Sequence, residues 1–253
     1  KSILTVILAL LAMQYSLGQS DNYSSQFNVL NYGAKGDSST NCTAAIQSAI
    51  DACGESGGGT VTVPSGVYLT GMITLKDNVC LNLTAGSELR AIPDLEYFPA
   101  TEPGIPSNFN PFYRWSMIYA ENAKNICIKG QGTINGQGQA DAFERISPKR
   151  PERYQNRPSI LRIVNCKGVQ VKGIKLINSA FWTFHLMGSK DIVVHGISIY
   201  SRTANYNNDG IDIDGCEDVR VSDCYITSAD DAISIKATGD RPVRNVLIDN
   251  CLL

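Results

Sequence analysis

The sequence lacks a strong charge imbalance. Its 253 residues include 22 Lys and Arg and 24 Asp and Glu, which gives a net charge of −2 and a pI near 5.7. Proteins that bind nucleic acid usually concentrate basic residues on one surface, so this composition argues against nucleic acid as a partner. No Pro- or Ser-rich linker divides the chain either, and we therefore expect one domain.

Long apolar runs are also scarce. The only one, Ile3–Ala12, is too short to cross a bilayer and is followed by the small residues Ser16-Leu17-Gly18. This pattern is typical of a secretory signal peptide. The mature protein is then expected to be secreted or periplasmic, free of the membrane, and monomeric. We predict a signal peptide over residues 1–18, a short linker over 19–26 and one domain over 27–253.

Cysteine pairs with metal-binding spacing are missing. None of the eight cysteines forms a C-x-x-C pair, so we expect no metal site and no cofactor. Eight cysteines in an exported protein suggest disulfides. However, Cys224 and Cys251 occupy equivalent inward positions of successive repeats, where thiols pack as small core residues. Cys42 and Cys53 bracket a short predicted helix and cannot bridge across it. The disulfide pairing is left open.

Hairpin signals are scarce too, since Asn135-Gly136 is the only Asn-Gly pair. Instead the chain contains a repeat. Segments beginning at Val169, Ile192, Val219 and Val246 carry small or apolar residues at offsets 0, 2, 5 and 7, at steps of 23, 27 and 27 residues. Short period-2 strands at this spacing leave no room for helices and predict an all-β, right-handed parallel β-helix. A β-sandwich is the competing architecture, but it requires hairpin turns.

One helix is predicted before the repeats. Segment Thr43–Cys53 places Ile46, Ala49 and Ile50 on one face at helical spacing, and Gly54 follows as a stop signal. We expect this short amphipathic helix to cap the open N-terminal rung of the β-helix.

Aligning the repeats predicts which residues are neighbours. Matching Gly188 with Gly215 places Trp182 over Asp209 and His185 over Asp212. Matching the two acidic segments places Asp209 beside Asp231, on rungs about 4.8 Å apart. The apolar residues Phe184, Ile211 and Ile233 then form one inward stack, and the polar residues between the apolar positions point away from the core.

Three carboxylates should therefore share one groove: Asp209 and the doublet Asp230-Asp231. Like charges held close together repel, so at least one of these groups should have a raised pKa. Two carboxyl groups in different protonation states are what glycosidic bond cleavage requires. The alternative is that these acids are ordinary turn residues, as we expect of Asp240.

The acidic motifs resemble those of the polygalacturonase family of glycoside hydrolases, family 28. Asn207-Asn208-Asp209 is similar to the family's Asn-Thr-Asp motif, and Asp230-Asp231 to its Asp-Asp motif. The segment Phe27–Asp37 and the segments Gly57–Tyr68 and Leu75–Val79 also resemble the family. The resemblance implies a parallel β-helix that cleaves pectin backbones, galacturonan or rhamnogalacturonan, with inversion.

The resemblance also implies roles for the carboxylates. Asp230 is expected to be the acid that protonates the leaving oxygen, and Asp209 and Asp231 are expected to hold and activate the attacking water. The family's Gly-His-Gly and Arg-x-Lys segments are not present, and the first is expected near Leu252. Because the apolar strand Val246–Leu253 would also leave a last rung uncovered, we expect a domain that is incomplete at its C-terminus.

Four further residues are candidates for substrate binding, each with a simpler alternative. Asn207 would orient Asp209 or a bound hydroxyl, or serve only the turn. His185 would bond a sugar or pair with Asp212. Lys236 would attract a uronate carboxylate, or form an exposed ion pair with Asp214 on the neighbouring rung. Trp182 would offer a sugar platform or pack the groove wall.

The long segment Pro93–Arg157 is rich in aromatic residues and Arg. Insertions of this kind on one face of a solenoid often build the binding groove, and in the resembling family they can close one end of it and favour end-on cleavage. Two other functions remain open. A β-helix pectate lyase would require Ca²⁺ and an Arg base, and a non-catalytic carbohydrate-binding β-helix would not depend on Asp230.

Overall fold

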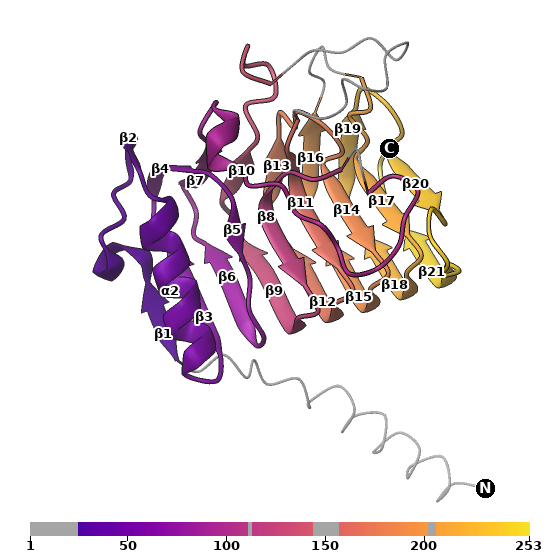
Figure 1. The fold of residues 1–253 in the computed structure, drawn as a ribbon, viewed down its shortest axis with the longest axis horizontal. Coiled ribbons are helices and arrows are strands. Elements are labelled where there is room, and N and C mark those ends of the chain that lie inside the picture. The colour runs from indigo at the N-terminus through magenta and orange to yellow at the C-terminus, as the bar shows by residue number, and fades with distance from the viewer. Residues whose placement is uncertain (1–24, 111–112, 144–156, 202–205) are drawn as a thin grey trace, which may run out of the picture.

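The computed structural model describes residues 25–110, 113–143, 157–201 and 206–253. The chain winds into a coil whose strands form three sheets running along one axis (Figure 1). Every strand pairing in these ranges is parallel, with one register shift between β2 and β4. This confirms the predicted right-handed parallel β-helix and excludes the β-sandwich. The predicted signal peptide, and most of the linker, lie outside the described residues.

Sheet A has eight strands. They are β1 (Gln26–Asn28), β3 (Gly59–Val63), β6 (Val79–Leu83), β9 (Lys124–Gly130), β12 (Lys167–Lys172), β15 (Lys190–His195), β18 (Glu217–Ser222) and β21 (Arg244–Asp249). Sheet B has seven. They are β2 (Asp37–Asn41), β4 (Gly66–Thr70), β7 (Ser87–Ala91), β10 (Thr133–Asn135), β13 (Lys175–Ile177), β16 (Ser198–Ser201) and β19 (Tyr225–Ser228).

Sheet C has six strands and carries the predicted groove. They are β5 (Ile73–Thr74), β8 (Ser116–Glu121), β11 (Ser159–Val164), β14 (Phe184–Met187), β17 (Ile211–Asp214) and β20 (Ile233–Lys236). Two short 3₁₀ helices, η1 (Val29–Tyr32) and η2 (Leu95–Tyr97), and one α-helix, α2 (Thr43–Glu55), complete the described elements.

The predicted register is confirmed. In sheet A, Ile192 pairs with Val169 on one side and with Val219 on the other, and Val219 pairs with Val246. Each of these side chains points inward, because residues at even spacing on a strand share one face. In sheet C, the inward stack of Phe184, Ile211 and Ile233 is formed as predicted. The apolar alternation of the sequence therefore decides which residues meet across the rungs.

The corners between sheets C and A depend on residues that adopt a left-handed backbone. Asn122, Asn165, Gly188 and Gly215 occupy this corner on four successive rungs, with φ of 58°, 49°, 59° and 60°. Asn and Gly tolerate this conformation far better than other residues. The two Asn side chains also hydrogen-bond to each other along the axis, so the corner aligns one rung with the next.

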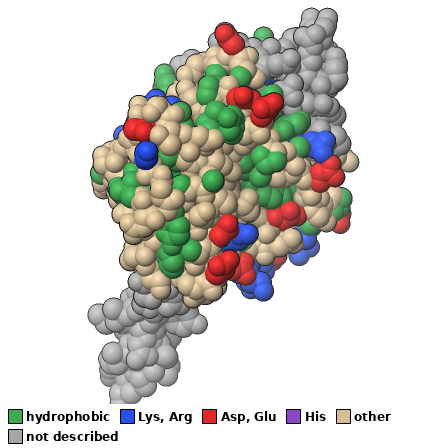
Figure 2. All heavy atoms as spheres, turned by 60° about the vertical axis from the view of Figure 1, so that its left-hand side comes forward, with side chains coloured by type: hydrophobic (Ala, Val, Ile, Leu, Met, Phe, Trp, Pro, Cys, Tyr) green, Lys and Arg blue, Asp and Glu red, His purple; other side chains and the backbone are tan. Residues whose placement is uncertain are grey.

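Helix α2 lies at the N-terminal end of the coil (Figure 1). Its buried residues Ile46, Ala49, Ile50 and Cys53 join the core, as predicted. The predicted stop at Gly54 is wrong, because the helix continues to Glu55 and ends where three glycines with positive φ follow. Figure 2 shows this end of the molecule, where apolar side chains are exposed only as small patches between polar atoms.

One disulfide joins neighbouring rungs. Cys80 on β6 and Cys127 on β9 are register partners in sheet A, with Cα atoms 4.2 Å apart. The sequence pattern did not identify this pair. The other six cysteines are free thiols, which include Cys224 and Cys251 at the inward positions where free thiols were expected. Within the described ranges, no helix is long and apolar enough to span a lipid bilayer.

Candidate active site

The outward face of sheet C carries a row of polar side chains. Register pairing aligns Tyr119, Arg162, His185, Asp212 and Ser234 on successive strands from β8 to β20. The predicted alignment of His185 with Asp212 is therefore confirmed. These side chains point away from the core because each alternates with an inward apolar residue of its strand.

The acidic residues enter the site from the bends that precede β17 and β20. The N–H of Gly210 donates to the carbonyl of Asp231 over 2.8 Å, which joins the two bends directly. Any side chain at Gly210 would lie 2.3 Å from the carbonyl oxygen of Ala232, so only glycine fits here. Asn207 adopts a left-handed φ of 57° in the first bend. Asp230 and Asp231 are exposed, whereas Asp209 is buried, contrary to its expected place on an open surface.

Lys236 lies between two buried carboxylates. Its Nζ is 2.8 Å from Asp212 Oδ1 and 3.2 Å from Asp209 Oδ2, and only 19% of its side chain is exposed. The expected exposed pair between Lys236 and Asp214 is wrong, although their backbones are register partners. The lysine charge is thus used to compensate Asp209 and Asp212 inside the protein.

Burial raises the pKa of Asp212 well above its usual value, and repulsion from Asp209 adds to the effect. Burial also raises the pKa of Asp209, the charge of Lys236 opposes the rise, and the charge of Asp230 adds to it. A raised pKa was expected from crowding, and desolvation is the larger cause. Burial and mutual repulsion therefore disfavour a state in which both carboxyls are charged, and the one lysine couples their protonation.

His185 is buried beside a different aspartate from the one expected. Its Nε2 lies 3.5 Å from Asp214 Oδ2, and both side chains are almost fully buried. The alternative in which His185 pairs with Asp212 is wrong, because its partner is Asp214. Burial lowers the pKa of His185, and its contact with Asp214 only partly opposes this, so the imidazole is neutral at neutral pH.

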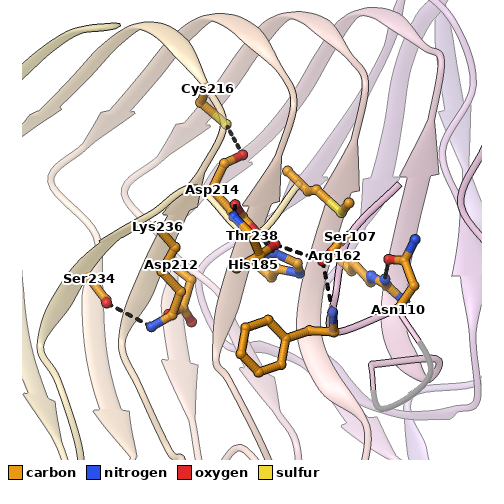
Figure 3. Close-up of polar contacts among 12 residues, drawn as sticks. Ser107, Asn110, Arg162, His185, Asp212, Asp214, Cys216, Ser234, Lys236 and Thr238 are labelled. Atoms are coloured by element: carbon orange, nitrogen blue, oxygen red, sulfur yellow. Dashed lines mark hydrogen bonds and ion pairs between the residues drawn. The ribbon is translucent and has the colours of Figure 1, made fainter. Parts of the chain in front are cut away.

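A long segment covers one side of the site. We call residues 101–110 and 113–115 the strap, and Figure 1 shows it crossing sheet C toward β20. At its far end, Ser107 Oγ lies 2.6 Å from Thr238 Oγ1, and the N–H of Asn108 donates to the Thr238 carbonyl over 3.0 Å. Thr238 in turn donates its N–H to Asp214 Oδ1 over 2.8 Å and its hydroxyl to Oδ2 of the same carboxylate. Figure 3 shows this chain of contacts between the strap and the sheet.

The strap also buries Trp182. The ring of Tyr113 stacks on Trp182 with centroids 4.1 Å apart, and Lys236 Nζ lies 4.7 Å from the same indole ring. Trp182 is only 4% exposed. In this arrangement Trp182 packs the groove wall, and its role as a sugar platform stays a prediction.

Sequence reasoning aligned Asp212 and Asp214 with the groove but gave neither a role, and it missed Thr238 and Arg162. Asp212 and Asp214 alternate with isoleucines on one short strand, so two carboxylates on the outward face of a repeat were a usable signal. Thr238 carried no signal, because its function depends on a contact with Ser107 that lies 131 residues away. In the part of the chain that the structure describes, no cluster of three His, Cys, Asp or Glu residues could hold a metal ion.

The Thr238–Asp214 contact should stabilise the strap. Burial raises the pKa of Asp214, but the contact with His185 and the hydrogen bonds from Thr238 outweigh it, so this pKa lies below the ordinary 3.8. A lowered carboxyl pKa contributes stability above 3.8 that is lost as the pH falls through the folded-state pKa. We expect Thr238→Val to lower the free energy of unfolding by about 2 kcal/mol at neutral pH, with a smaller difference in acid. Urea unfolding at both pH values measures this.

Thr238→Ser is the matched control because it keeps the hydroxyl, and it should retain most of the stability at neutral pH. A loss from Thr238→Val that is equally large in acid would contradict the assignment, since Asp214 is then protonated in both proteins.

A coil of three parallel sheets with acidic residues gathered on the outward face of one sheet defines a parallel β-helix protein with a candidate catalytic groove. The sequence profile described as Glycosyl hydrolases family 28 matches residues 53–252, and the chain belongs to this family.

Individual relatives agree with this assignment. A probable polygalacturonase from Vitis vinifera is 31% identical over 222 residues, which cover 84% of this chain and 44% of that protein. The crystal structure of a hyperthermoactive exopolygalacturonase from Thermotoga maritima matches with a TM-score of 0.74 and 26% identity, over 90% of this chain and 66% of that one. An endo-polygalacturonase from Pectobacterium carotovorum is 29% identical, over 85% of this chain and 56% of that protein. The chain thus spans about half the length of these two sequence relatives.

Proposed function

We propose that this protein hydrolyses α-glycosidic bonds in pectic polysaccharide, with inversion at the anomeric carbon. The carrying observation is that Asp209 and the Asp230-Asp231 doublet lie on adjoining bends joined by the Gly210–Asp231 hydrogen bond. Membership of glycosyl hydrolase family 28 and the similarity to polygalacturonases support the reaction and the substrate class.

In this proposal Asp230 donates a proton to the leaving glycosidic oxygen. The opposed base accepts a proton from water, and inverting enzymes keep the two carboxyls about 6.5–9.5 Å apart to leave room for that water. Asp209 suits the base because Lys236 lies within 3.2 Å of it and favours its charged form. Asp212 would then be the protonated carboxyl of the buried pair, and its hydroxyl would donate a hydrogen bond to the Asp209 carboxylate. Asp231 would complete the water site.

Three further residues would contribute to substrate binding mainly by positioning other groups of the groove: Asn207, His185 and Trp182. Asn207 stands in the bend before Asp209, where its amide would orient that carboxylate or a sugar hydroxyl. His185 and Trp182 lie beneath the strap, so they would support the groove wall. Lys236, with two carboxylate partners, would set the charge of the site rather than bind a uronate.

The strap supports an end-on mode of cleavage. It covers the row of polar side chains at Arg162 and His185, which are both almost fully buried. Its far end is held by the hydrogen bond between Ser107 and Thr238. A polysaccharide then enters the groove from one side only. Exopolygalacturonases are among the similar proteins, as is an endo-polygalacturonase.

We also propose that the protein is exported, because the apolar run Ile3–Ala12 and the small residues after it fit a signal peptide. An extracellular or periplasmic site of action would suit a substrate that occurs in cell walls. Amino-terminal sequencing of the protein recovered from culture medium or periplasm tests this; retention in the cytoplasm with residues 1–18 present would contradict it.

The reaction is tested with polygalacturonate and the protein as its gene encodes it, with a chelator present. Hydrolysis releases reducing ends without ultraviolet absorbance, and end-on cleavage releases short products from the first minutes. A rise in ultraviolet absorbance when Ca²⁺ replaces the chelator would indicate a pectate lyase, and binding without new reducing ends would indicate a non-catalytic binding protein. Either outcome would overturn the proposal.

A further inference from the structure

Arg162 is a buried charge on the groove row. It lies on the outward face of β11, as the register partner of Tyr119 on β8 and of His185 on β14. It is 1% exposed and is one of the two largest fully buried side chains in the described residues. The strap covers it, and Figure 3 shows Arg162 on the sheet beside Asn110 on the strap.

The guanidinium of Arg162 has no carboxylate partner within ion-pair distance in the described ranges. Its Nη1 donates to Thr101 Oγ1 over 3.2 Å, and its Nη2 reaches Asn110 Oδ1 only at 3.5 Å. Its Nε has no hydrogen-bond acceptor. Glu121 on the neighbouring strand is held by Tyr119 and by the N–H of Gly104 instead.

This arrangement is costly for folding. A guanidinium stays charged at neutral pH even though burial lowers the pKa of Arg162 to about 10. Buried charges are ordinarily paired, as Lys236 is with Asp209 and Asp212. The charge of Glu121 acts on Arg162 from beyond ion-pair distance, and the hydrogen-bond partners of the guanidinium are neutral. The guanidinium therefore has hydrogen-bonding capacity left for an anion that pairs with it directly.

A cavity is lined in part by Asn110. It has a volume of about 360 Å³ and is lined by Glu102, Pro103, Asn110 and Arg114 of the strap. Asn110 is thus a wall of the cavity as well as the weakest partner of Arg162. The Asn110 amide also donates from Nδ2 to the Ile105 carbonyl over 2.9 Å, so a ligand that takes the place of this side chain must break that bond as well as the long contact with Arg162.

We propose that Arg162 binds the carboxylate of a uronic acid residue at the strap-covered end of the groove, and that this carboxylate displaces the Asn110 side chain. The planar guanidinium matches a carboxylate with two parallel hydrogen bonds and would supply the acceptor that its Nε lacks. A neutral sugar cannot pair the charge, so the site selects acidic sugars. This inference rests on the proposed pectic substrate and adds the residue that recognises its acid group.

The test compares two trisaccharides, trigalacturonate and its neutral galactose counterpart, by titration calorimetry. The full-length protein carries Asp230→Asn in every measurement, so that turnover does not consume the ligand. Arg162→Met should weaken trigalacturonate binding by roughly 10- to 100-fold and leave binding of the neutral sugar unchanged. Arg162→Lys should fall between, because Lys keeps the charge without the planar fork.

Arg90→Met on sheet B is the control, since Arg90 is paired with Glu88 far from the groove, and it should not change the preference. If Arg162 only supports the strap, Arg162→Met and Arg162→Lys will lower the melting temperature while the preference for the acidic sugar stays as in the parent. That result would overturn the inference. If the protein binds trigalacturonate through Arg162 but releases no reducing ends from polygalacturonate, the hydrolase proposal fails and this inference stands.

Discussion

Asp230→Asn should lower kcat on polygalacturonate by about 10³-fold in the protein as its gene encodes it. Asparagine keeps the shape of the side chain but cannot donate an acidic proton to the leaving oxygen. The exposed Asp230 makes few structural contacts, its main ones being the carbonyl that accepts from Ser228 and the carboxylate that accepts from Asp231 N–H. KM and the melting temperature should therefore change little. Reducing-end assays over a range of substrate concentrations measure kcat and KM separately.

Asp240→Asn is the matched control, because Asp240 is also an exposed acid in a bend near the site, and we expect it to leave kcat unchanged. Full activity of Asp230→Asn would remove the acid role and with it the proposed mechanism. A kcat loss of equal size in both variants would show that the enzyme responds to the general charge of this surface and has no specific acid at Asp230.

Lys236→Met should both destabilise the protein and abolish hydrolysis. Methionine fills a similar volume but leaves Asp209 and Asp212 buried without their shared cation, which should cost about 3 kcal/mol of folding stability. The pKa values of both carboxyls, already raised, should rise further, so Asp209 would be protonated and unable to accept a proton from water. Denaturant unfolding and activity assays on the same preparation measure both effects.

The pH dependence of the Lys236→Met loss identifies its cause. Carboxyls with raised pKa values bind more protons in the folded than in the unfolded state, so stability falls as the pH rises from 3.8 through the folded-state values. The variant should therefore be closest to the parent in acid and furthest from it at neutral pH. Lys190→Met is the control, since Lys190 also contacts two acids, Glu217 and Asp218, but on an exposed surface. It should have little effect, and a loss equal to that of Lys236→Met would contradict the role of burial.

The fold could be predicted because the signal is local and repeated. Val169 and its equivalents recur at nearly constant steps, and each rung must place its apolar residues inward, so only one register satisfies all of them. The alignment of His185 with Asp212 follows from that register. The disulfide between Cys80 and Cys127 was missed because the repeat is irregular at that point, with a sequence separation of 47 between the partners.

The site could be predicted only in part, because the strap decides which outward residues meet solvent. Nothing in the repeat shows that Trp182 is covered by Tyr113 or that Asp209 is buried. The partner of Lys236 was also predicted wrongly for this reason. Register alone places Asp214 beside it, whereas its long side chain turns to the buried pair of Asp209 and Asp212, where a cation is needed most.

The contact between Ser107 and Thr238 also limits when the strap can fold during synthesis of the chain. The ribosome adds 131 residues between the two partners, so the nascent chain carries the strap long before its anchor exists. Aromatic residues such as Phe109 and Tyr113 lack their partner Trp182 during much of that time, and chaperones bind apolar surface of this kind. Folding dominated by such distant contacts is slow. The groove is consequently among the last parts of this coil to assemble, and a chain stalled before Thr238 would expose its strap.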